Sequence, residues 1–484
     1  MWYELGMAES DAGRPTRAVA TRFVSCVGLG LLVWWLPTPA GMSWNGWAVL
    51  AVFTATIVSF LLRPLPMGAM VLIGLVVLSA TGALDYKKEA LTGFGDTTVW
   101  LVVAAFLIAG AVGRSGLGQR VALLMVRTFG RSTLGLGYAA CAAELALGPF
   151  VPSNTARGGG VMAPIQNSLA RALGSRPDHQ PRRAGEFLML VGAHANLIAA
   201  AMFLTGMAAN PIVAQQAAAI LDINFDWGTW ALGAVVPGLV SLALLPLLIY
   251  RLAPPLLDDA SAARRAAQEQ LAALGTWTRR EQLMSGVFLL LLALWTTKGT
   301  FHDMGSSLVA WIGVCTLLIT RTDRWEDMAR DHGAWDTLVW LGGLLSMAAA
   351  LQTHGVITWF ANGMRDAVTG IDGVLVALVL ALIYFFSMYG FSMLTGHITA
   401  MAGAFFAVSL AAGAPPLLTV ALIAYFSNLC GCLTNYSTGP VVIYFGLGYV
   451  PIGRWFRIGF LVALMHLAVW ILIGGVWWKA LGWW

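Results

Sequence analysis

Charged residues are scarce in this sequence. Asp, Glu, Lys and Arg make up 11% of its 484 residues, whereas 58% are hydrophobic and the mean hydropathy is +0.76. Soluble globular domains carry about a quarter charged residues, so the composition excludes that class. Because apolar runs recur along the whole chain, the sequence predicts an all-α polytopic membrane protein.

Cysteine and the usual catalytic motifs are also rare or missing. The five cysteines lie in or beside apolar runs, and no His or second Cys pair accompanies the C-x-C of Cys430 and Cys432. This pattern indicates neither a disulfide framework nor a metal site, so no metal ligand is assigned. The H-E-x-x-H, G-x-S-x-G and Walker motifs are absent, which argues against a membrane enzyme. An anion channel remains an alternative.

The apolar runs predict about 11 transmembrane helices and two re-entrant hairpins. The hairpins are expected near 134–170 and 373–413, where apolar sequence is interrupted in the middle. We expect the chain to be organised in four parts: an N-terminal segment with the first helix at 1–44, a first inverted repeat at 45–250, a cytoplasmic linker at 251–283, and a second inverted repeat at 284–484.

Lysine and arginine are distributed unevenly between the loops. With the N-terminus in the cytoplasm, most of the 28 Lys and Arg fall on cytoplasmic segments, as the positive-inside rule requires. Arg157 lies in the first hairpin, and the exceptions on the outer side are Lys87, Lys88, Lys298, Arg365 and Lys479. The sequence therefore predicts a multi-pass membrane protein with its N-terminus in the cytoplasm, whose hairpins enter from opposite faces.

The most informative stretch is ALGPFVPSNTARGGGVMAPI, residues 145–164. Pro152 ends the incoming helix, the Ser-Asn-Thr turn offers polar groups, and the glycine triplet permits close approach of a backbone or ligand. Irregular backbone at membrane depth persists only where protein or a water-filled cavity satisfies its polar groups. This stretch therefore predicts an anion or ion site.

Short similarities between the two halves support an inverted repeat. LTGMAANPI at 204–212 and LTNYSTGPV at 433–441 share Leu, Thr and Pro at an offset of 229 residues. SNTARGGG and HITAMAGA share Thr155 and Thr399 at an offset of 244. Inverted repeats with broken helices are typical of secondary transporters, whose substrate sites lie at the breaks.

Three segments carry a family resemblance: PSNTARGGGVMAPI, HANLIAAAMFLTGMAANP and LTNYSTGPVVIYFGLGYVPIGRWFRIGF. They resemble the divalent anion/sodium symporter (DASS) superfamily, in its branch of bacterial citrate/succinate or tartrate/succinate antiporters and plastid 2-oxoglutarate/malate translocators. The resemblance implies a homodimeric elevator-type transporter in which a transport domain carries both hairpins and both broken helices. It also implies di- or tricarboxylate substrates (succinate, malate, fumarate, tartrate, 2-oxoglutarate or citrate) and the lipid of a bacterial inner membrane as its surroundings. No cofactor and no nucleic acid are expected.

The resemblance also implies the substrate-binding residues, because the family's Ser-Asn-Thr hairpin tips bind carboxylates. The first tip is Ser153, Asn154 and Thr155. The second tip departs from the pattern, since it supplies Thr395, Gly396, His397 and Thr399 where sodium-coupled relatives have another Ser-Asn-Thr. The broken helices are expected to add Asn196, Thr205 and Asn210 from one half, and Asn428, Thr434, Asn435, Ser437 and Thr438 from the other.

A dicarboxylate brings about two negative charges into the membrane, where an uncompensated charge is costly. Helix N-termini supply roughly half a positive charge each, and sodium ions or fixed cations must supply the rest. Arg157 and His397 lie beside the two tips, which favours sodium-independent antiport with a built-in countercharge. Two alternatives stay open: Arg157 pairs with Glu144 and His397 only fixes its tip, or the protein is a sodium-coupled dicarboxylate symporter.

Overall fold

The computed structural model describes residues 16–151, 153–368 and 370–484. The start of the expected N-terminal segment, residues 1–15, and the helix-breaking Pro152 lie outside this range. Contacts divide the chain into two compact units, one of residues 1–99 with 335–363 and one of residues 100–334 with 364–484. Each unit draws on both expected repeats, so the repeat boundaries stay a prediction.

The described residues form helices and no β-strand. Eight of the described helices are long and apolar enough to cross a membrane, and five shorter helices are also apolar. Two of the eight, Gly373–Gly390 and Leu394–Ala411, are the arms of the second expected hairpin. The prediction of an all-α membrane protein is confirmed, whereas the count of about 11 transmembrane helices stays an expectation.

The first unit is built around a close contact at a glycine. A Cβ on Gly93 would lie 2.0 Å from the carbonyl oxygen of Gly342, and the Gly93 N–H donates to Ser346 Oγ at 2.9 Å. Only glycine allows this approach of two backbones. The elements of this unit are α2 (Thr16–Trp35), α3 (Trp44–Leu62), α4 (Met67–Ala80), η1 (Tyr86–Ala90), η2 (Thr92–Gly95), and parts of α16 (His332–Thr353) and α17 (Val356–Val368).

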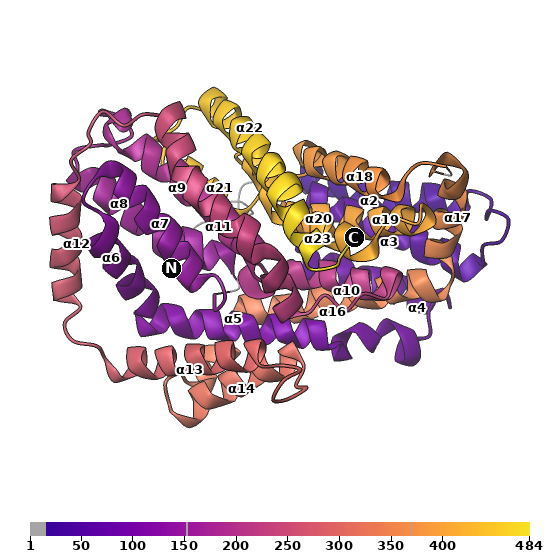
Figure 1. The fold of residues 1–484 in the computed structure, drawn as a ribbon. Coiled ribbons are helices and arrows are strands. Elements are labelled where there is room, and N and C mark those ends of the chain that lie inside the picture. Colours follow the sequence, from indigo (N-terminus) through magenta and orange to yellow (C-terminus); the bar gives the residue numbers. More distant parts are fainter. Residues whose placement is uncertain (1–15, 152, 369) are drawn as a thin grey trace. The chain divides into compact units, whose positions relative to one another are not determined.

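The second unit is centred on α9 (Gly185–Met202), in which all residues are buried. Helix α9 packs against α7 (Thr133–Leu147), α8 (Ala163–Ala172), α11 (Trp227–Leu252), α20 (Pro416–Leu429) and α21 (Gly439–Gly446). Its neighbour α11 runs alongside it in Figure 1. Outside the hairpins and broken helices, the unit contains most of α5 (Thr97–Ser115), α6 (Leu117–Phe129), η4 (Pro181–Arg183), α11 (Trp227–Leu252), α12 (Ser261–Ala273), α13 (Arg279–Thr296), α14 (Ser306–Ile319), α15 (Trp325–Ala329), α22 (Ile452–Ala468), η8 (Val469–Gly474) and α23 (Gly475–Ala480).

Each expected hairpin is a pair of helices with a break between them. The first consists of α7 (Thr133–Leu147), the π-helical η3 (Thr155–Met162) and α8 (Ala163–Ala172). The second consists of α18 (Gly373–Ser387), η6 (Met388–Gly390) and α19 (Leu394–Ala411). The glycines of the triplet differ in how closely they are packed. A Cβ on Gly158 would lie 2.6 Å from Asn196 Nδ2, whereas one on Gly160 would meet nothing within 4 Å.

Two further helices are interrupted near their middle. One runs through α9, η5 (Leu204–Gly206) and α10 (Asn210–Leu221), and the other through α20 (Pro416–Leu429), η7 (Cys430–Leu433) and α21 (Gly439–Gly446). Polar side chains satisfy the carbonyls that each break frees. Asn210 Nδ2 donates to the carbonyls of Ala200 and Phe203, both at 2.9 Å, and Ser437 Oγ donates to that of Gly431 at 2.7 Å.

The linker between the expected repeats folds onto the base of the first hairpin. Helix α12 packs against α6 and α8 (Figure 1). Gln270 Nε2 donates to Ser168 Oγ at 3.0 Å. The buried Arg120 of α6 donates to Glu281 at 2.6 Å, at the start of α13. Burial alone would raise the pKa of Glu281, but hydrogen bonds from Arg120 and Thr278 hold it below its ordinary value.

Candidate functional site

A buried ion pair lies behind the tip of the first hairpin. Arg157 Nε donates to Glu144 Oε2 at 2.6 Å, and both side chains are fully buried. The rest of the guanidinium donates to the carbonyls of Val151 at 2.6 Å, Gly206 at 3.1 Å and Asn196 at 3.4 Å. Arg157 thus ties the tip to the broken helix. Its guanidinium hydrogen bonds go to protein groups, and they include the Glu144 contact that the sequence left as an alternative.

Asn196 completes this network from α9. Its Nδ2 donates to Glu144 Oε1 at 3.1 Å and Oε2 at 3.0 Å, and to the carbonyl of Asn154 at 3.3 Å. The carboxylate therefore fixes the orientation of the amide. The Oδ1 atom of Asn196 is left buried, with no hydrogen-bond partner among the described residues.

The tips of both hairpins reach one unwound segment, residues 434–438 between η7 and α21. Asn154 Nδ2 of the first tip donates to Thr438 Oγ1 at 3.1 Å. The N–H of Leu394, which begins α19 after the second tip, donates to the carbonyl of Ser437 at 2.8 Å. Two hairpins far apart in sequence therefore converge on adjacent residues, which is the arrangement expected of a shared site.

Thr205 and Thr434, which share the 229-residue offset, differ in how their hydroxyls are used. Thr205 Oγ1 donates to the carbonyl of Pro149 at 2.6 Å and accepts from Trp227 Nε1 at 3.0 Å. Trp227 in turn stacks on Trp295, with ring centroids 5.1 Å apart. The hydroxyl of Thr434 is buried and has no partner among the described residues. Thr205 therefore anchors the first tip, whereas Thr434 keeps its hydrogen-bonding capacity.

The second tip differs from its sequence-based description. The helical break lies at residues 388–393, and Thr395, His397 and Thr399 lie on the first turns of α19. His397 is fully buried; its Nε2 lies 2.8 Å from Ser387 Oγ, and its ring centroid lies 4.3 Å from that of Tyr384. Its Nδ1 has no partner among the described residues.

Tyr384 was missed from the sequence, although spacing carried a signal. The numbers 384 − 144 and 397 − 157 both equal 240, so Tyr384 and His397 stand where Glu144 and Arg157 stand in the first hairpin. Thr155 and Thr395 share this offset, whereas the short windows pair Thr155 with Thr399 at 244 residues. Tyr384 Oη also bonds Ser427 Oγ of α20 at 2.8 Å, much as Glu144 bonds Asn196 of α9.

The remaining expected site residues lie at or near the two tips. Ser153 Oγ accepts from the N–H of Ala156 at 3.1 Å and so supports the first turn of the tip. Thr155 is exposed and packs against Gly439, where a Cβ would lie 2.4 Å from Thr155 Oγ1. Thr395 and Asn435 are half-buried, and the buried Thr399 hydroxyl has no partner among the described residues.

Residues 17–484 match the family described as the sodium:sulfate symporter transmembrane region. The chain belongs to this family. Its membership confirms the resemblance to the divalent anion/sodium symporters that the three segments indicated. The chain is accordingly a membrane transporter and not an enzyme.

Relatives within the family align along nearly the whole chain. The putative malate transporter YflS of Bacillus subtilis is 42% identical over 99% of this chain and 100% of its own length. Dicarboxylate transporter 1, chloroplastic, of Spinacia oleracea is 40% identical over 94% of this chain and 80% of its own. The inner membrane protein YbhI of Escherichia coli is 33% identical over 96% and 98%.

A solved structure has a fold similar to that of this chain. The crystal structure of the Alcanivorax borkumensis YdaH transporter superposes with a TM-score of 0.57 at 15% identity, covering 86% of this chain and 98% of the other. At this identity the likeness concerns the fold alone. It supports the helical fold without assigning any residue.

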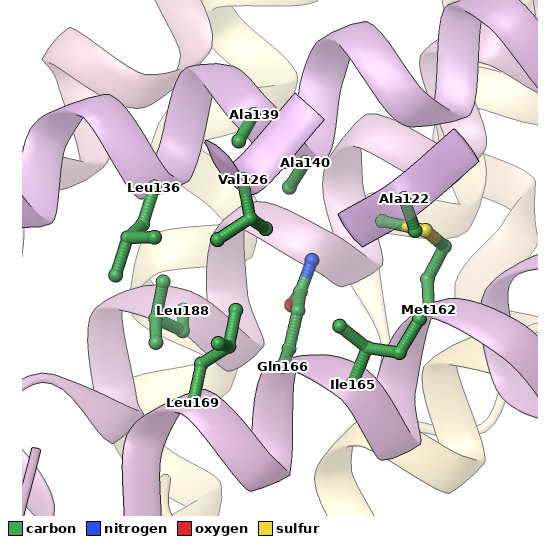
Figure 2. A pocket seen from close by; sticks show the side chains of 10 residues that line it. All are labelled: Ala122, Val126, Leu136, Ala139, Ala140, Met162, Ile165, Gln166, Leu169 and Leu188. Carbon is green, nitrogen blue, oxygen red and sulfur yellow. The ribbon is translucent and has the colours of Figure 1, made fainter. Parts of the chain in front are cut away.

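A pocket at the base of the first hairpin, away from the tips, does not suit a carboxylate. Figure 2 shows the amide of Gln166 surrounded by apolar side chains. Neither polar atom of that amide has a partner among the described residues. The lining offers one amide and no cation to pair with a carboxylate. The other residues lining it are Ala122, Val126, Leu136, Ala139, Ala140, Met162, Ile165, Leu169 and Leu188.

Proposed function

We propose that this transporter exchanges di- or tricarboxylates across the bacterial inner membrane without sodium. The convergence of both tips on Ser437 and Thr438 carries this proposal. It directs two helix N-termini, those of the η3–α8 arm and of α19, toward one segment, and helix N-termini attract anionic groups. The names of the relatives, malate and dicarboxylate transporters, support carboxylates as the substrate class.

The charges around the tips support independence from sodium. The second tip lacks a Ser-Asn-Thr, and a histidine stands beside it instead. At the first tip, Glu144 neutralises Arg157, so we keep Arg157 in the proposed site as the residue that holds the tip. The helix N-termini and His397 then supply the countercharge. Sodium-coupled dicarboxylate symport is the competing function, because the family description names sodium.

An elevator mechanism and a homodimer belong to the same proposal. The second unit contains both hairpins and both broken helices, as a moving transport domain would. Interrupted helices in opposed halves are the usual site of alternating access in secondary transporters. The selectivity among succinate, malate, fumarate, tartrate, 2-oxoglutarate and citrate depends on which of them the two tips accommodate.

The test is uptake of labelled succinate into proteoliposomes preloaded with succinate, malate, citrate or nothing. Each preload is measured in sodium, potassium and choline buffers. We expect uptake only with an internal carboxylate, at equal rates in the three buffers. Uptake into empty liposomes that rises steeply with the sodium gradient would establish the symporter instead, and substrate current without an internal carboxylate would establish a channel.

A further inference from the structure

The hydrogen bonds of Ser387 favour one tautomer of His397. Ser387 Oγ lies 2.8 Å from the carbonyl of Tyr384, which can only accept, and we assign its single hydroxyl hydrogen to that bond. In this arrangement Ser387 Oγ accepts from His397 Nε2, 2.8 Å away, so Nε2 carries the hydrogen. A neutral imidazole carries its hydrogen on one nitrogen only. Nδ1 is consequently bare, and it is buried with no partner among the described residues.

The surroundings of His397 contain no fixed charge to compensate an imidazolium. Helix α19 packs chiefly against α10, α18 and α20, and across their described lengths these four helices contain no Asp, Glu, Lys or Arg. The titratable groups they bring are Tyr384 on α18 and Tyr425 on α20, with the thiol of Cys430 following α20. An isolated buried cation is costly, so the arrangement favours neutral His397 while the site is empty.

A bound carboxylate reverses this preference. An anion next to Nδ1 stabilises the protonated ring, and the new N–H then makes a charge-assisted hydrogen bond to it. Ser392 Oγ at the break and Thr399 Oγ1 one turn into α19 are also buried without partners among the described residues. The start of α19 thus holds three unused polar atoms, one before and two after Leu394 in the sequence, and the N–H of Leu394 bonds the unwound segment that both tips reach.

We propose that His397 takes up one proton at Nδ1 whenever a dicarboxylate binds, and releases it when the dicarboxylate leaves. The proton comes from the aqueous phase, forms the Nδ1–H bond, and is shared in a hydrogen bond with one substrate carboxylate. The Nε2–H bond to Ser387 is unchanged throughout. This inference rests on the proposed carboxylate transport. It means that one proton crosses the membrane with each substrate molecule, in either direction.

Calorimetry of succinate binding to the purified transporter tests the inference. At about pH 7.5 both carboxylates of succinate are ionised, so a proton taken up comes from the buffer and is registered through its ionisation enthalpy. We expect the binding enthalpy to differ between phosphate and Tris buffers by the amount for about one proton. Affinity should also fall about tenfold for each unit of pH rise above neutral.

The histidine variants assign this proton. His397→Gln should remove both the buffer dependence and the pH slope, whereas His179→Gln, at an exposed position, should leave both unchanged. Succinate binding without proton uptake by the unmodified protein would overturn the inference and leave the transport function standing. Retention of proton uptake by a folded His397→Gln protein would also overturn it. Absence of any carboxylate binding or exchange would instead refute the proposed function.

Discussion

The first hairpin holds its tip with a buried ion pair, whereas the second uses a phenol and an imidazole at the same spacing. Glu144 and Arg157 are fully buried and joined at 2.6 Å, while Tyr384 and His397 are buried ring against ring at 4.3 Å. Tyr384 follows Glu144, and His397 follows Arg157, by the same 240 residues. The comparison shows that the same helix–break–helix hairpin can be held either by a buried ion pair or by neutral rings.

The difference has consequences for how each hairpin can respond to a ligand. A buried ion pair stabilises little in itself, but removing one partner costs about 3 to 5 kcal/mol because a charge is stranded. A neutral hydrogen bond contributes about 1 kcal/mol. The first hairpin is therefore committed to one charge state. The second can change its charge by one proton at His397, with little rearrangement of its partners.

The largest effect is expected when the ion pair of the first hairpin is broken. Arg157→Gln leaves the Glu144 carboxylate buried without its countercharge, and should destabilise the transporter by about 3 to 5 kcal/mol. The stability of Arg157→Lys should fall between that of the unmodified protein and that of Arg157→Gln. An ammonium keeps the charge but cannot reach the same set of acceptors. Thermal unfolding in detergent, with succinate exchange in proteoliposomes, measures both consequences.

Glu144→Gln combined with Arg157→Gln is the matched control for that prediction. With both charges removed, we expect most of the lost stability and much of the exchange to return. Recovery of stability without recovery of carboxylate binding would show that the guanidinium acts on the substrate. In that case the first hairpin, rather than His397, supplies the countercharge.

The second effect concerns the polar tip itself. Asn154→Ala removes the amide that reaches Thr438 and is placed to meet a carboxylate. The loss of one charge-assisted hydrogen bond costs about 1.5 to 3 kcal/mol, or roughly ten- to a hundredfold in succinate affinity. Binding and unfolding measured on the same preparation separate the two roles. An unchanged affinity in a stable variant would remove this tip from the site.

The sequence was sufficient to predict both hairpins and the first tip. The Pro-Ser-Asn-Thr turn and the glycines required a break in apolar sequence, and such a break can occur in only a few ways within a membrane. The residues expected at the second tip, Thr395, Gly396, His397 and Thr399, lie on the first turns of α19, after the break at residues 388–393. Tyr384 could not be recognised from composition, since an apolar helix contains many aromatic residues that only pack.

The hydrogen-bond roles of single residues were beyond the reach of sequence. Thr205 and Thr434 occur in matching motifs, yet only Thr205 has both its donor and its acceptor capacity used. This difference depends on where Trp227 of α11 lies, and nothing in the motif specifies that. For Arg157 the sequence offered two partners, Glu144 or a ligand, and the choice between them depends on three-dimensional packing within the hairpin.

The third prediction tests Thr205, which anchors the first tip independently of the ion pair. Thr205→Val keeps the shape but leaves the Pro149 carbonyl and the Trp227 N–H without their shared partner. We expect a loss of about 1.5 kcal/mol in stability, with weaker succinate binding because the tip is less firmly held. Thr205→Ser retains the hydroxyl and should preserve both properties. Equal loss in the two variants would show that the methyl group, not the hydrogen bond, matters.

The smallest effect is expected at the neutral pair of the second hairpin. Tyr384→Phe removes the phenol oxygen but keeps the ring against His397, and Ser427 Oγ still donates to the carbonyl of Ile423 at 2.7 Å. Because no buried group is left unpaired, the free energy of unfolding should fall by about 1 kcal/mol or less. Glu144→Gln, the substitution at the equivalent position of the first hairpin, should cost several times more, because it strands the Arg157 guanidinium. Similar losses from the two substitutions, measured by thermal unfolding under the same conditions, would show that the two hairpins are held alike.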